Sequence, residues 1–109
     1  MANTFKLKTK ANVGVTTVGI YTAPASTTTV VIGITLANTS GSGVNVGVGV
    51  TRAGTTEDVK LLKNAPIPSG SSLEFMAGNK IVLEAIDTVT VDSDTNNSVD
   101  AALTIMEIT

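Results

Sequence analysis

Apolar and polar residues alternate along most of the chain, with the period of two that predicts β-strands. The longest alternating stretch covers residues 28–51 and is divided by a turn of small polar residues at 38–43. Its apolar positions are Val30, Ile32, Ile34 and Leu36 before the turn, and Val44, Val46, Val48 and Val50 after it. Two such runs joined by a turn predict a long antiparallel hairpin with one buried face. We expect this hairpin to form the centre of the fold.

The opposite face of the predicted hairpin carries mostly small residues, namely Val31, Gly33, Thr35 and Ala37 on one strand and Asn45, Gly47 and Gly49 on the other. A face of Gly, Ala and Thr has little relief, so another backbone or sheet can approach it closely. The face is either a flat surface exposed to solvent or a contact with another chain. On the second interpretation, the candidate assembly residues are Gly33, Thr35, Asn45, Gly47 and Gly49.

The two ends of the chain suggest further contacts. Residues 1–12 form a predicted N-terminal strand or arm, in which Lys6, Lys8 and Lys10 alternate with less polar residues. These lysines either touch an acidic partner such as a neighbouring subunit, or protect an edge strand from pairing with other edges. The last strand, 99–109, is apolar on both sides, with Met106 and Ile108 on the second side. We expect it to be covered on both sides or to lie at a subunit contact.

The fold class follows from the spacing of strands and turns. Turn residues recur every eight to twelve positions and no segment has a convincing helical period, which is typical of an all-β sandwich or barrel. The 109 residues are enough for one domain, so we predict a single antiparallel β-sandwich over 13–109, jelly-roll or immunoglobulin-like, with roughly eight strands. Only 3% of the residues are aromatic, so Val, Ile, Leu and Ala must fill the core.

The residue types offer little for catalysis. The chain has no His and no Cys, which removes the usual general base, the thiolate nucleophile and the zinc ligands. Residues 92–97 begin like a calcium-binding loop, but Asn97 replaces the required Gly and Leu103 the required Glu, so a polar turn is the simpler interpretation. The acids Glu74, Glu84 and Asp87 have no aromatic sugar platform near them in the sequence, and we expect them to face solvent. We therefore predict no enzyme, cofactor or metal site.

The net charge and the hydropathy of the chain limit the classes of partner that we expect it to bind. A net charge of -2 argues against nucleic acid, whose partners usually present a clustered positive field. No apolar run approaches the roughly 20 residues of a membrane span, and no signal peptide is evident, so we expect a soluble protein made in a cytoplasm.

Five segments together resemble small virion proteins of tailed bacteriophages: 21–24 (YTAP), 27–31 (TTTVV), 36–40 (LANTS), 66–73 (PIPSGSSL) and 82–85 (VLEA) followed by Asp87. The resemblance spans about residues 20–109. It implies a β-sandwich displayed on a phage particle, synthesised in the host cytoplasm. It also implies other virion proteins as partners, such as major capsid or tail subunits, and a homo-oligomer.

The implied role is non-enzymatic, with three alternatives. The first is a capsid decoration or cement protein, which binds by its sheet faces and its N-terminal arm. The second is a component of the tail, neck or fibre. The third is a carbohydrate- or receptor-binding module, for which exposed Trp or Tyr would be expected, whereas the chain has only Tyr21. Many weak copies on a lattice would bind strongly together, because each attachment raises the effective concentration for the next.

Overall fold

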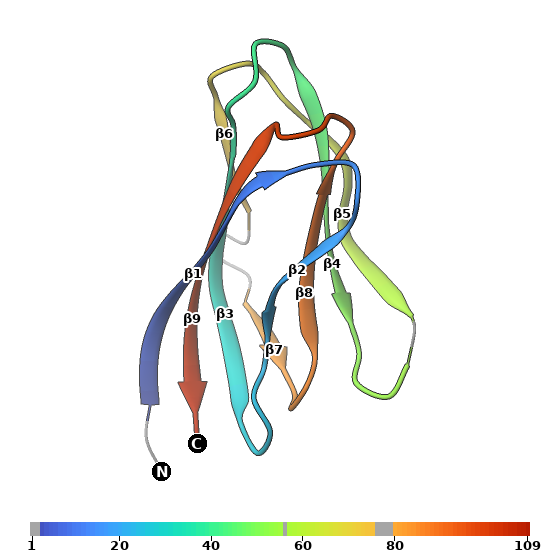
Figure 1. The fold of residues 1–109 in the computed structure, drawn as a ribbon. Coiled ribbons are helices and arrows are strands. Elements are labelled where there is room, and N and C mark those ends of the chain that lie inside the picture. The colour runs from blue at the N-terminus through green and yellow to red at the C-terminus, as the bar shows by residue number, and fades with distance from the viewer. Residues whose placement is uncertain (1–2, 56, 76–79) are drawn as a thin grey trace.

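The computed structural model describes residues 3–55, 57–75 and 80–109, which form nine strands in two antiparallel sheets (Figure 1). Sheet A consists of β1 (Asn3–Val13), β9 (Val99–Ile108), β3 (Thr28–Asn38) and, both beside β3, β6 (Ser72–Phe75) and β7 (Ile81–Leu83). Sheet B has the order β2 (Val18–Thr22), β8 (Thr88–Ser93), β4 (Val44–Thr51) and β5 (Asp58–Ile67). The described residues include no helix. The predicted all-β antiparallel sandwich is confirmed.

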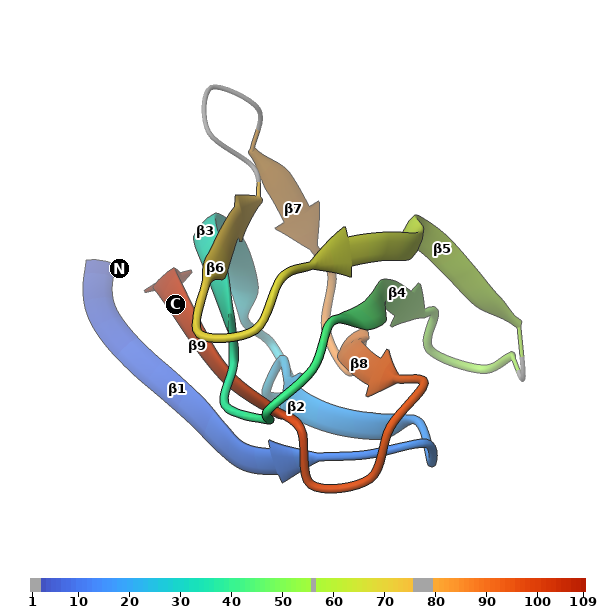
Figure 2. The same cartoon turned by 90° about the horizontal axis from the view of Figure 1, so that it is seen from above.

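The strand order is that of a jelly roll. The first four strands alternate between the two sheets, and Figure 2 shows the sheets as two layers facing each other. β6 pairs with residues 34–37 of β3 and β7 with residues 29–31, so the two short strands together occupy one strand position. Counted this way, the sandwich has the eight strands of two interleaved Greek keys. Of the two expected sandwich types, the structure is the jelly roll.

The predicted hairpin over residues 28–51 is wrong. β3 belongs to sheet A and β4 to sheet B, so the turn between them is a corner that crosses from one layer to the other. The Asn38 side chain holds this corner, because its amide donates to the carbonyls of Ser42 at 2.8 Å and Ile67 at 2.9 Å. Its Oδ1 also accepts the Ser40 N–H at 2.9 Å. Two alternating runs can bury their apolar sides by facing each other across a sandwich as well as by pairing edge to edge.

A bulge in β3 also corrects the predicted buried face. The register with β9 shifts between Val31 and Gly33, and an extra residue in a strand reverses its inside-outside alternation. Val31 therefore points into the core before the bulge, and Ile34 and Leu36 do so after it. Val30 and Ile32, predicted to be buried, lie on the outer side of sheet A and are only partly buried. All four predicted valines of β4 are buried as expected.

The core between the sheets is aliphatic, as the composition predicted. Its largest fully buried side chains include Leu36, Leu83, Leu103 and Ile105, which face the valines of β4 and β8. Tyr21 is the aromatic residue among the buried ones that the structure describes. Burying such side chains contributes about 1.5–3 kcal/mol each, so the interior alone explains why these strands close into a sandwich.

Candidate functional site

The outer side of sheet A is unusually apolar. Cross-strand register places six large apolar side chains on it, and Ile32 in the bulge of β3 adds a seventh. We call these residues the apolar face: Phe5 and Leu7 of β1, Val30 and Ile32 of β3, Val82 of β7, and Met106 and Ile108 of β9. Phe5 is 69% exposed, Leu7 66% and Val82 59%. Scattered exposed apolar residues are normal, whereas a contiguous group of them marks an interaction surface.

Small residues occupy the other half of the same outer surface. We call this the small-residue half: Thr9 of β1, Gly33, Thr35 and Ala37 of β3, and Ala102 of β9. A Cβ added at Gly33 would meet no atom within 4 Å, so the sheet is open to solvent there. A hollow of about 310 Å³ lies over this half, lined mainly by small residues of β1, β3 and β9. Asp100 and Lys10 also line this hollow, and Glu74 lies beside Thr35 as its register partner on β6.

The structure brings together four of the residues predicted from the sequence as assembly contacts. Gly33, Thr35, Met106 and Ile108 all lie on the outer side of sheet A. Sequence reasoning missed Phe5 and Leu7, although their alternation with the three lysines was the signal that could have found them. It also missed Val30 and Ile32, because the bulge that turns them outward leaves no clear mark in the sequence.

Asn45, Gly47 and Gly49 lie on a different surface, the outer side of sheet B. Asn45 is exposed, whereas Gly47 and Gly49 are buried under side chains of this chain. A Cβ at Gly47 would lie 2.6 Å from Asp92 Oδ1, and one at Gly49 would lie 2.6 Å from Asp58 Oδ1. The two glycines therefore make room for these carboxylates, and they do not form one flat face with Gly33 and Thr35.

The carboxylates above these glycines hold a lysine. Lys60 Nζ lies 2.9 Å from Asp58 Oδ2 and 3.5 Å from Asp92 Oδ2. The hydrogen bond to Asp58, together with the charge of Asp92, raises the pKa of Lys60. Asp92 also accepts a hydrogen bond from Thr17 at 3.0 Å, and Asp58 accepts one from Thr90 at 3.2 Å. The members of the cluster satisfy one another, and they link β5 to β8 across β4 and to Thr17 just before β2.

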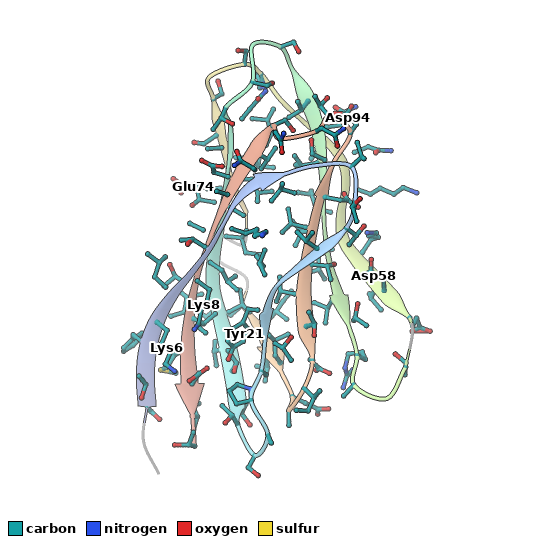
Figure 3. All side chains as sticks on the ribbon, viewed as in Figure 1. Lys6, Lys8, Tyr21, Asp58, Glu74 and Asp94 are labelled. Carbon is teal, nitrogen blue, oxygen red and sulfur yellow. The ribbon has the colours of Figure 1, made fainter. Side chains whose placement is uncertain are left out.

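The three N-terminal lysines share one side of β1, as predicted, but it is the side opposite the apolar face. Lys6, Lys8 and Lys10 pair across β9 with the inward-facing Ile105, Leu103 and Ala101. Lys6 is not free, since its Nζ lies 2.8 Å from Glu107 Oε1. Figure 3 shows Lys6 and Lys8 at the end of the sandwich where the two termini lie.

A buried polar cluster joins both sheets at this end. The Tyr21 hydroxyl donates to Glu107 Oε2 at 2.6 Å and shares a hydrogen bond with Thr29 Oγ1 at 2.8 Å. Burial, and then the hydrogen bond to Glu107, raises the pKa of Tyr21 to about 12. The hydrogen bonds from Lys6 and Tyr21 lower the pKa of Glu107 and outweigh the effect of its burial. Tyr21 is thus a structural residue, 7% exposed, and offers no ring for stacking on a sugar.

The three acids expected to face solvent, Glu74, Glu84 and Asp87, lie in different surroundings. Glu74 lies in β6 on the outer side of sheet A. Asp87 is buried, contrary to the expectation that it faces solvent, and it accepts the backbone N–H groups of Ala53 and Glu84 at 2.9 Å each. Arg52 Nε lies 3.1 Å from Asp87, and Arg52 Nη2 donates to exposed Glu84 at 2.6 Å.

Burial alone would raise the pKa of Asp87, but its two backbone hydrogen bonds and the nearby guanidinium of Arg52 lower it. A second hollow, of about 390 Å³, lies beside this group between β5 and β7. Its aliphatic lining includes Val59, Leu61 and Ile81. Arg52 at its edge is paired with both Asp87 and Glu84, and these contacts hold the β7–β8 turn against the loop after β4.

Residues 94–98 form the polar turn that the sequence predicted between β8 and β9. Asp94 Oδ1 accepts the N–H of Asn45 at 3.1 Å, and the hydroxyls of Ser93 and Ser98 lie 2.7 Å apart. In the part of the chain that the structure describes, no group of three or more His, Cys, Asp or Glu side chains could hold a metal ion. That part also has no helix able to cross a membrane.

Comparison with known proteins yields a likeness of fold. No protein-family description matches the chain, and no curated protein matches it in sequence. A solved structure is similar over 99% of this chain and 87% of its own, with a TM-score of 0.60 and 17% sequence identity. It is described as Bacillus endospore appendages, which form a family of disulfide-linked pili. At this identity the match shows a shared sandwich architecture.

Proposed function

We propose that this protein is a non-enzymatic structural subunit of a repeating assembly, and that its setting is the virion of a tailed bacteriophage, as a capsid decoration or cement protein. The observation that carries the proposal is the apolar face of sheet A. Phe5, Leu7 and Val82 are more than half exposed on one side of the sandwich, whereas the other outer side carries the ion pairs of Lys60 with Asp58 and Asp92. A subunit that buries this side against other subunits removes the exposed apolar area from water.

The virion setting is supported by the sequence resemblance, and the structural class by the fold. The solved structure of the endospore appendage pili shares the architecture, which supports a role in assembly by repetition. The chain has no cysteine, so the disulfide linkage of those pili has no counterpart in it. A tail, neck or fibre position is the alternative within the virion. A sugar-binding module is disfavoured because the only Tyr is buried.

Copy number on the particle tests the proposal. Quantitative mass spectrometry of purified virions of the phage that encodes the chain should detect this protein in a fixed ratio to the major capsid protein. Hundreds of copies per particle would support head decoration, and a handful would support the tail or neck. Absence from purified particles would overturn the virion proposal.

The structure also indicates which substitution tests the apolar face without damaging the fold. Deleting residues 1–12 would remove most of β1, expose the edge of β9 and damage the fold together with any contact. Leu7→Asp, by contrast, alters an exposed side chain, and Val15→Asp is a matched control because Val15 is 56% exposed in the loop after β1. We expect Leu7→Asp to lower occupancy on the particle and Val15→Asp to leave it unchanged.

A further inference from the structure

We infer that the outer side of sheet A binds a second copy of this chain, face to face, around a two-fold axis that runs across the strands near Leu7, Gly33 and Thr104. This inference rests on the proposed function, since it names the partner of the same surface. It follows from the relief of the surface, its charge and its size.

The shape of this outer surface is complementary to itself, because one half protrudes and the other half is hollow. One cross-strand row of large side chains contains Phe5, Met106 and Val30, which are direct register partners. A second row, four residues further along β1, contains Thr9, Ala102 and Thr35, and ends at Glu74 on β6. The row between them contains Leu7, Thr104 and Gly33. A two-fold axis along this middle row places the large row of each copy over the small row of the other.

The small row has room for what the large row would insert. The hollow of about 310 Å³ is lined by Thr9, Thr35 and Ala102 together with residues next to them. A cavity of about 150 Å³ accepts a benzene ring, so this hollow can take the large side chains of a partner. Because each copy has one protruding half and one hollow half, two copies form two identical sets of contacts, as an isologous interface requires.

Charge does not oppose the pairing. Of the outward-facing residues that the structure describes on the strands of sheet A, only Glu74 and Asp100 are charged. Glu74 lies beside Thr35 at the lateral end of the small row, and Asp100 lies at the edge of the hollow. A two-fold axis through the middle row places the carboxylates of the two copies at opposite ends of the interface. The three lysines alternate to the other side of the sheet, and of them only Lys10 lies at the edge of the hollow.

The area suits a stable pair. Three strands of 10 or 11 residues and the β6–β7 position beside them form the surface. Four strands about 4.8 Å apart, each rising about 3.3 Å per residue, cover roughly 600 Å² in projection, and side-chain relief adds to the accessible area. Stable interfaces bury about 800 Å² per partner. Sheets with low relief pack about 10 Å apart, which the small residues here permit.

Sedimentation velocity over a wide concentration range tests the inference on the purified full chain. We expect the wild type and Val15→Asp to form dimers. We expect Leu7→Asp to weaken dimerisation roughly 30-fold or more, because it places a charge in the centre of an apolar contact. Circular dichroism of the three proteins should show the same fold, since both altered side chains are exposed. A wild type that stays monomeric, or that grows into open-ended polymers, would overturn the two-fold arrangement.

A cross-linking experiment locates the axis independently. The chain has no cysteine, so a single Thr104→Cys substitution adds a unique thiol on the middle row. A short bifunctional thiol reagent should join two such chains efficiently and should fail with Gly41→Cys, whose position lies in the loop after β3 and away from the interface. Equal yields from the two variants would contradict the inference. If the chain is monomeric but Leu7→Asp still lowers virion occupancy, the inferred dimer is wrong and the proposed function stands. If the chain forms the dimer but is absent from virions, the dimer stands and the proposed function is wrong.

Discussion

Replacing Tyr21 by Phe should destabilise the fold strongly, although it removes one oxygen atom. The ring keeps its packing, but Glu107 loses a donor at 2.6 Å and Thr29 loses its partner at 2.8 Å. A hydrogen bond to a charged group contributes about 1.5–3 kcal/mol and a neutral one about 1 kcal/mol. Because Lys6 still satisfies the other oxygen of Glu107, we expect a net loss of about 2–3 kcal/mol in the free energy of unfolding.

Urea denaturation and thermal melting measure this loss. For a domain of this size, about 2–3 kcal/mol corresponds to a fall in Tm of roughly 10–15 °C. Thr22→Val is a suitable control, since it removes a hydroxyl whose 2.9 Å hydrogen bond to Thr88 is exposed, and it should change stability by less than about 0.5 kcal/mol. A Tyr21→Phe protein within about 0.5 kcal/mol of the wild type would refute the argument that this cluster joins the two sheets.

The pH dependence of the difference gives a second check. The folded state lowers the pKa of Glu107 mainly through Lys6 and then Tyr21, so the unfolded chain binds its proton first as the pH falls. The stabilisation is therefore present above the unfolded pKa of about 4.3, and it is lost as the pH falls through the folded pKa. Tyr21→Phe weakens this contribution, so the gap between wild type and variant should be full at neutral pH and shrink in acid. A constant gap would contradict the role assigned to the carboxylate.

Three further outcomes are expected. Gly49→Ala should cost about 1–3 kcal/mol of stability in urea titrations because its Cβ would press on Asp58, whereas Gly41→Ala, with open space around it, should be nearly neutral. Asp87→Asn should cost about 2–3 kcal/mol by the same measurement, since an amide cannot accept from both backbone N–H groups with two carboxylate oxygens. In an alkaline absorbance titration, Tyr21 should ionise near pH 12, and the stability gained by its raised pKa should be lost between pH about 10 and 12.

The sequence was sufficient to predict strands and fold class but not which strands pair. Alternation along Val44–Val50 correctly identified one buried side, because β4 has its core on one side and small residues on the other. The same alternation in β3 could not reveal that its partner lies in the facing sheet. The corner is fixed by Asn38, whose side-chain amide donates to the carbonyl of Ser42 in the corner and to that of Ile67 at the end of β5 in sheet B. The sequence pattern of an Asn before a Gly-rich turn occurs in a hairpin and in a corner between sheets, so it does not distinguish the two connections.

The position of the bulge in β3 could not be predicted from the sequence either. Residues 30–32 are all apolar, so either phase of alternation fits them, and only pairing with β9 decides that Val31 points inward. The consequence is large, because Val30 and Ile32 then join Phe5 and Leu7 on the outer side. The apolar face is therefore a product of tertiary pairing. Its residues come from strands that run from β1 to β9 in the chain, so no short segment of the sequence contains it.

The glycines show why small residues alone do not define a contact surface. Gly33 has nothing within 4 Å of its missing side chain, whereas Gly47 and Gly49 lie directly under Asp92 and Asp58. The sequence groups all three as parts of one flat face, yet the first leaves the surface open and the others admit carboxylates that close it. The difference arises from neighbouring strands, since β5 and β8 place the carboxylates of Asp58 and Asp92 over these glycines. Whether the surface at a glycine is open to a partner thus depends on the side chains of the neighbouring strands, and the open surface is that of sheet A.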